Sequence, residues 1–151
     1  MIRDFERYHG VVLRELIAKA SGPLEIESVD CVRGTVIAVN KNICVTVKHS
    51  SKRVAPWLFG FTDHNLKDLK NWTSSFSSVW LALVCGPDGF LTLNLSEFEE
   101  INVRSDVAKF IRIDRNRNTM YRVFGNAGRL QVSKPRGLNQ VILELAREAL
   151  V

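Results

Sequence analysis

Two β-branched runs separated by a short polar junction constrain the fold of this chain more than any other feature. They occupy residues 32–40 and 43–49. The junction, Asn40-Lys41-Asn42, contains asparagines, which tolerate the positive φ angles that a tight hairpin needs. We therefore predict two antiparallel strands. A further run, Val79 to Cys85, is apolar at every position, which is typical of a strand covered on both faces.

Helical and strand-like patterns alternate through the rest of the chain. Apolar residues recur at helical spacing in 2–20 and 62–72, with Thr62 or Asp63 as the N-cap of the second helix. Ser96 is expected to cap a short acidic helix that ends at Ile101, and 138–150 forms a last helix. Alternating segments predict strands at 24–30, 90–95, 109–114 and 120–125, and a short strand at 130–132.

This order predicts one α+β domain spanning residues 1–151. The core of this domain covers about residues 2–85 and consists of a helix, an antiparallel-rich mixed sheet, a second helix and a strand. The rest of the chain, about residues 86–151, adds a β-hairpin and a helix. Hydrophobic residues are 46% and charged residues 25%, as in ordinary globular proteins. The longest apolar run is far shorter than the roughly 20 residues needed to cross a bilayer. We expect a cytoplasmic protein with no membrane partner.

The three cysteines and the net charge of +5 set further limits. An odd number of cysteines without CxxC spacing favours buried thiols over disulfides or metal ligands. The charge is uneven, because residues 1–103 carry 11 basic and 12 acidic side chains while the basic segment, residues 104–136, carries nine basic against two acidic. Such a local excess, +7, is typical of a surface that binds nucleic acid or another polyanion, although a solvated hairpin face has the same composition.

A second group of cations follows the strand at 43–49. Lys48 and His49 close that strand, Lys52 and Arg53 lie in the next loop, and Trp57 follows Pro56. Lysine and arginine beside a stacking tryptophan suit a single strand or a DNA backbone. In the alternative interpretation the cations are solvated, and Trp57, Phe59 and Phe61 alternate into the core. His9 could meet His49 near Lys48 if the first helix crosses the hairpin, as a general acid or phosphate contact, or as a structural hydrogen-bonded histidine.

The order of helix, three strands, helix and strand over about 2–85 resembles the core of the PD-(D/E)XK nuclease superfamily, which restriction enzymes and Holliday-junction resolvases share. Members place an acid on the first helix, an aspartate near the second strand, and (D/E)-x-Lys on the third strand. Two carboxylates there hold a divalent cation, and the lysine orients or activates the attacking water. The sequence VTVKHS is similar to that third strand, and the resemblance makes Lys48 its motif lysine.

The acidic positions depart from this pattern. Thr46 stands where the third strand should carry its acid, and residues 35–40 contain no acid at all. A threonine hydroxyl would hold Mg²⁺ weakly. Substitute carboxylates would have to come from other segments, with Glu15 and Asp30 as the catalytic candidates and Glu6, Glu25 and Glu27 as further ones.

Three readings follow, and the sequence leaves open whether the protein is an enzyme. In the first it binds DNA or RNA with a nuclease-like fold whose metal-dependent phosphodiesterase chemistry is lost or altered. In the second it is an active nuclease with relocated acids that uses Mg²⁺ or Mn²⁺. In the third it has no nucleic-acid role, and the helix at 138–150 with exposed parts of Trp57 or Trp72 binds a protein partner or a second copy. The expected nucleic-acid contacts are Lys48, His49, Lys52, Arg53, Trp57, Arg112, Arg115, Arg117 and Arg122.

Overall fold

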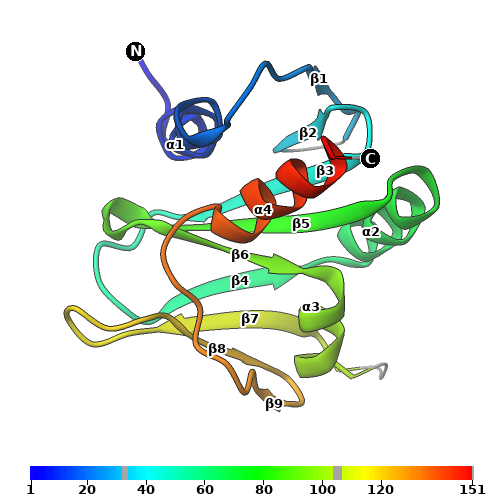
Figure 1. The fold of residues 1–151 in the computed structure, drawn as a ribbon. Helices are drawn as coiled ribbons and strands as arrows, with labels where there is room; N and C mark the ends of the chain where they lie inside the picture. The colour runs from blue at the N-terminus through cyan, green and yellow to red at the C-terminus, as the bar shows by residue number, and fades with distance from the viewer. Residues whose placement is uncertain (32–33, 104–106, 151) are drawn as a thin grey trace.

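Two β-sheets and four α-helices make up the part of the chain that the computed structural model describes, residues 1–31, 34–103 and 107–150 (Figure 1). The predicted α+β class is confirmed. No helix among these residues is both long and apolar enough to span a membrane.

The first sheet is mixed, with the strand order β1-β2-β3-β5-β6. The predicted hairpin is β2 and β3, and its junction has positive φ angles at Asn40 and Lys41. Residues 32 and 33, at the start of the predicted second strand, lie outside the described residues. β5 lies parallel to β3, and β6 is antiparallel to β5. The strands are β1 (Ile26–Ser28), β2 (Thr35–Val39), β3 (Ile43–Ser50), β5 (Ser78–Cys85) and β6 (Phe90–Asn94).

Helices α1 (Asp4–Lys19) and α4 (Asn139–Glu148) pack on one face of this sheet (Figure 1). Their apolar stripes, including Leu16 and Val141, share a buried cluster with Val45 of β3. Helix α2 (Asp63–Ser75) and the second sheet cover the opposite face. Both faces of β5 are covered, which accounts for the predicted apolar run from Val79 to Cys85.

The second sheet is antiparallel, with the order β4-β7-β8-β9, and it contains a strand that we did not predict. In β4 (Trp57–Phe61) the residues Trp57, Phe59 and Phe61 are buried, while Leu58 and Gly60 are exposed. The sequence alternates in the manner of a strand, but it is short and follows a proline loop. The alternative interpretation, in which these aromatic residues enter the core, is the one observed. The other strands are β7 (Lys109–Asp114), β8 (Arg122–Gly125) and β9 (Gly128–Arg129).

Two smaller predictions were wrong. Helix α3 (Leu95–Ile101) is capped by Asn94, not by Ser96, because the Asn94 side chain accepts a hydrogen bond from the backbone N–H of Glu97 at 2.8 Å. The last strand, β9, lies at Gly128–Arg129 and not at 130–132, because a tight turn brings Gly128 opposite Gly125. Between β5 and β6 the chain makes one 3₁₀ turn, η1 (Gly86–Asp88).

Candidate nucleic-acid interface

The end of β3 borders an open cavity of about 850 Å³. The pairing of β2 with β3 begins at Thr35, opposite Val47, so the last three residues of β3 extend beyond the segment that pairs with β2. The N-terminal part of α1, the end of β4 and the first turns of α2 form the other walls. We call this space the Lys48 cavity; its polar lining includes Arg3, His9, Thr46, Lys48, His49, His64, Asn65 and Asp68.

Lys48 points toward α2, where Asn65 accepts one of its hydrogen bonds. Its ammonium group donates to the carbonyl of Gly60 at 2.9 Å and to Oδ1 of Asn65 at 3.3 Å, and it lies 4.7 Å from the ring centre of Phe61. No carboxylate among the described residues forms a salt bridge with it. Burial lowers the pKa of Lys48. An ammonium has three donors, so one N–H remains available to an anion.

His9 and His49 meet at the wall of the same cavity, as the sequence suggested they could. Nε2 of His9 lies 2.9 Å from Nδ1 of His49, and Nδ1 of His9 lies 2.8 Å from the hydroxyl of Thr35. The ring of Tyr8 stacks on His49 at 5.5 Å. Both nitrogens of His9 are therefore engaged, whereas Nε2 of His49 has no hydrogen-bond partner among the described residues. His9 positions His49, whose remaining nitrogen is available for a ligand.

Acidification is expected to destabilise the protein through His9. Burial, and to a smaller extent the charge of His49, lowers the pKa of His9 from 6.5 to about 4. As the pH falls, His9 takes up a proton near pH 6.5 in the unfolded chain and only near pH 4 in the folded protein. The free energy of unfolding is therefore unaffected by protonation of His9 above pH 6.5 and decreases as the pH falls from 6.5 toward 4. After allowance for solvent screening the loss is on the order of 2 kcal/mol.

Urea unfolding at about pH 7 and about pH 4.5 measures this loss, with His9→Gln as the comparison. The variant should lose less stability between the two pH values than the parent protein. An equal loss in both proteins would contradict the assignment to His9.

The lining of the Lys48 cavity does not fit a divalent cation. Thr46 lines the cavity, and Asp68 is the one carboxylate in its described lining. Asp68 lies 3.7 Å from Nε2 of His64. No three His, Cys, Asp or Glu side chains gather as a metal site anywhere in the described chain. Mg²⁺ prefers several carboxylate and water oxygens, which this lining does not offer.

The proposed substitute acids lie elsewhere. Glu15, on α1, forms an ion pair with Lys19 at 2.8 Å and approaches the backbone of Gly137. Asp30 is exposed. Neither lines the Lys48 cavity, and the same is true of Glu6, Glu25 and Glu27.

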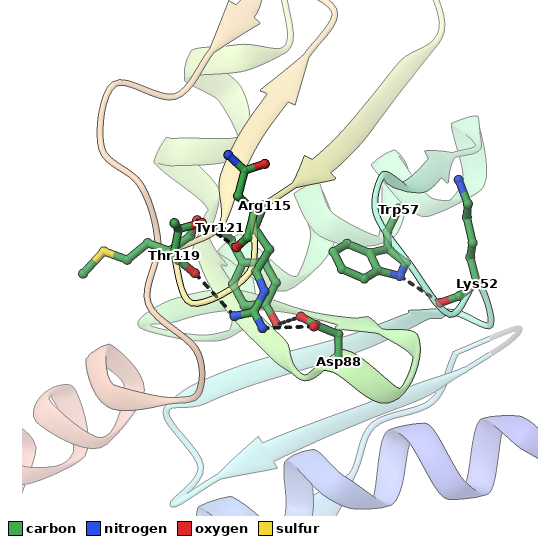
Figure 2. Close-up of polar contacts among 8 residues, drawn as sticks. Lys52, Trp57, Asp88, Arg115, Thr119 and Tyr121 are labelled. Atoms are coloured by element: carbon green, nitrogen blue, oxygen red, sulfur yellow. Dashed lines mark hydrogen bonds and ion pairs between the residues drawn. The ribbon is translucent and has the colours of Figure 1, made fainter.

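Trp57 does not offer a stacking surface, so its predicted nucleic-acid contact is wrong. Its side chain is 1% exposed, and its indole N–H donates to the carbonyl of Lys52 at 2.8 Å (Figure 2). The hydrophobic effect favours burial of so large a ring over its use at the surface. Its function is to hold the loop after β3 against the core.

The loop after β3 and the turn between β7 and β8 meet at η1. Gly86 approaches the carbonyl of Lys52 so closely that a Cβ atom would collide with it. On the other side, the guanidinium of Arg115 donates to Asp88 at 3.0 Å, and the hydroxyl of Tyr121 donates to the same carboxylate at 2.7 Å (Figure 2). We call this region the basic end; it comprises residues 51–56, η1 and residues 115–121.

The basic end carries a clear excess of positive charge. Asp88 is neutralised by Arg115, and its hydrogen bond helps to raise the pKa of Tyr121, an effect dominated by burial. The guanidinium of Arg136 packs against Gly89, just after η1. The exposed cations of the basic end, and Arg136 beside it, form no salt bridge with any described residue; those of the basic end are Lys52, Arg53 and Arg117.

The remaining cations of the basic segment have separate surroundings. Arg122 forms an ion pair with Asp114 at 3.5 Å, and Arg112 lies over the ring of Phe124. Lys134 is buried among acceptors in the core. Arg104 and Asp106 fall outside the described residues. The basic segment is therefore not one continuous basic face.

Sequence reasoning did not single out Thr35, Asp88 or Tyr121. The sequence around Asp88 indicates a turn, and the sequence around Tyr121 indicates a strand. Arg115 lies 27 positions from Asp88, and Thr35 lies 26 positions from His9. No local pattern links residues at such distances, so only the fold reveals these contacts.

No protein-family model and no curated protein sequence matches this chain. Among solved structures the fold is similar to that of a Holliday junction resolvase from the archaeal hyperthermophile Archaeoglobus fulgidus. The two chains are 13% identical, with a TM-score of 0.43, and the match covers 71% of this chain and 87% of the resolvase. At these values the match indicates an approximate similarity of fold and says nothing about activity.

Proposed function

We propose that this protein binds nucleic acid through its phosphate backbone and does not cleave it by metal-dependent phosphodiesterase chemistry. The observation that carries the proposal is the basic end. Two cationic segments that are far apart in the sequence meet at η1, and Arg115 already neutralises the carboxylate between them. The exposed cations that remain, Lys52, Arg53 and Arg117, form no salt bridge within the part of the chain that the structure describes.

Phosphate groups are the partner that such an arrangement suits best. Lysine and arginine side chains at loop tips reach phosphate oxygens without reading base edges, and each contact releases counterions from the nucleic acid. Affinity gained in this way is independent of sequence. The proposed ligand is therefore DNA or RNA, contacted through its backbone.

The Lys48 cavity lies close to the basic end along the chain. Lys48 and His49 end β3, and Lys52 and Arg53 follow in the next loop, so a bound strand that crosses the basic end can place a phosphate in the mouth of the cavity. The free N–H of Lys48 and Nε2 of His49 would contact it there. Burying an unpaired ammonium is unfavourable unless its charge is used, and a phosphate would supply the missing anion.

Removing the loop cations tests this proposal. In Lys52→Gln/Arg53→Gln, affinity for labelled DNA and RNA should fall by a similar factor for all sequences, and the slope of log K against log salt should decrease by roughly one per lost phosphate contact. Fluorescence anisotropy at several salt concentrations, with EDTA present, measures both quantities. The control variant Lys67→Gln/Lys70→Gln removes the same charge from the exposed side of α2 and should leave affinity nearly unchanged.

Other outcomes would favour the alternative readings. An equal loss of affinity in both double variants would mean that net charge, not the basic end, governs binding. Cleavage stimulated by Mn²⁺ and abolished by Lys48→Ala would establish an active nuclease instead. A dimer that forms independently of salt and ignores nucleic acid would indicate a protein-interaction module.

A further inference from the structure

The second sheet has one face in the core and one face that no other described element covers. Strand alternation directs Phe59, Ile111 and Val123 inward, where they are buried. The opposite face, which we call the outer face, carries Leu58, Gly60, Phe110, Arg112, Asp114, Arg122, Phe124 and Arg129. Leu58 is 65% exposed, and a Cβ atom added to Gly60 would meet nothing within 4 Å.

One row of this face combines aromatic and cationic side chains. The pairing register aligns Leu58 with Arg112, Arg112 with Phe124, and Phe124 with Arg129 across four strands. Cross-strand partners share a face, so these side chains lie side by side. The guanidinium carbons of Arg112 and Arg129 lie 4.1 Å and 5.8 Å from the ring centre of Phe124. The row therefore places planar groups at the surface, with Arg129 exposed and Arg112 and Phe124 half-buried.

The charge of the outer face excludes a second copy of the same face as its occupant. Its three arginines are opposed by Asp114 alone, which pairs with Arg122 at 3.5 Å. A symmetric dimer through this face would bring Arg112 and Arg129 close to their own copies, which like-charge repulsion disfavours. The face suits a ligand that is anionic and also has flat apolar surfaces.

We propose that the outer face binds single-stranded nucleic acid, with bases stacked on Phe124 and on the guanidinium planes of Arg112 and Arg129. Only a single strand offers free base faces, because a duplex stacks its bases internally. A four-stranded sheet is wide enough for two or three bases. The inference rests on the proposed function, since the strand would continue from the phosphate contacts of the basic end, which adjoins this face where β7 ends at Asp114 and β8 begins at Arg122.

Phe124→Leu separates stacking from phosphate binding. The variant keeps an apolar side chain and every charge but loses the aromatic ring. Affinity for a single-stranded oligonucleotide should fall by about fivefold or more, as expected for the loss of base stacking, with the salt slope unchanged. Affinity for a duplex of the same length should stay within about twofold of the parent. Anisotropy with both ligands measures this, and thermal unfolding checks that the variant is folded.

The outcomes for the basic end and for the outer face differ. If Phe124→Leu leaves single-strand affinity within about twofold while Lys52→Gln/Arg53→Gln weakens it, the outer-face inference is wrong and the proposed function stands. If the parent protein binds neither ligand at low salt, both are wrong.

A second variant decides the matter if Phe124→Leu does not fold. Phe124→Trp places an indole in the same row, and its additional emission, relative to the parent, should be quenched by the single strand and not by the duplex. Absence of quenching at saturating single strand would overturn the inference.

Discussion

Replacing Trp57 by alanine is expected to lower the free energy of unfolding by about 3–5 kcal/mol, the usual range for removing a large buried aromatic side chain. The indole is 1% exposed, packs edge-on against Tyr121 with 6.3 Å between the ring centres and 70° between the ring planes, and donates to the carbonyl of Lys52. Alanine would leave a cavity between the two sheets and would also release that carbonyl. Loss of packing dominates, because a single neutral hydrogen bond contributes only about 1 kcal/mol.

Urea unfolding followed by far-UV circular dichroism measures this change without relying on tryptophan emission. Trp72→Ala is the control, because Trp72 is only half-buried at the wall of the Lys48 cavity and should cost less stability. A loss below about 1 kcal/mol in Trp57→Ala, with weaker binding of single strands, would instead support a stacking function for Trp57.

Replacing Lys134 by alanine is expected to lower the free energy of unfolding by a comparable amount, about 3–5 kcal/mol, because it leaves the half-buried carboxylate of Glu97 without its cation. Lys134 is 3% exposed, and its ammonium donates to both oxygens of Glu97, at 3.0 and 2.9 Å, and to Gln140 at 2.7 Å. These contacts join the segment before α4 to α3. The backbone of Lys134 also exchanges two hydrogen bonds with Tyr121.

A double-mutant cycle separates the ion pair from the packing around it. Lys134→Met/Glu97→Gln removes both charges, keeps the volume, and retains an acceptor for the capping bond that Glu97 receives from the backbone of Asn94. It should recover most of the stability lost in Lys134→Ala, since apolar replacements of buried ion pairs are often close to neutral. Urea unfolding of all variants gives the coupling energy, and a double variant as unstable as Lys134→Ala would contradict the interpretation.

Lys134 also shows why a count of charges overstated the basic segment. Its charge is compensated inside the protein, so its removal should change nucleic-acid affinity much less than removal of Lys52 and Arg53. Arg115 and Arg122 likewise have carboxylate partners, Asp88 and Asp114. Composition identifies an excess of cations, but only their partners determine how much charge reaches the ligand.

The local elements of the fold could be predicted because their causes lie close together in the sequence. The apolar stripe of α1, the asparagine junction of the β2–β3 hairpin and the Thr62 cap of α2 each depend on residues within one or two turns of one another. β4 was missed because five alternating residues after a proline satisfy a loop as well as a strand. The strand is stabilised by its partner β7, about 50 residues away along the chain.

For the candidate interface, too, some features could be predicted from the sequence and others could not. The sequence by itself determined that Lys48 lies near the end of a strand, that cations follow it, and that Thr46 and not an acid stands two positions before it. Only the tertiary structure decided that Trp57 is buried, that His9 orients His49, and that η1 joins the two basic segments. The physical reason is that periodicity and turn chemistry act between near neighbours, whereas burial, ion pairing and hydrogen bonding between distant segments depend on how the sheets and helices pack.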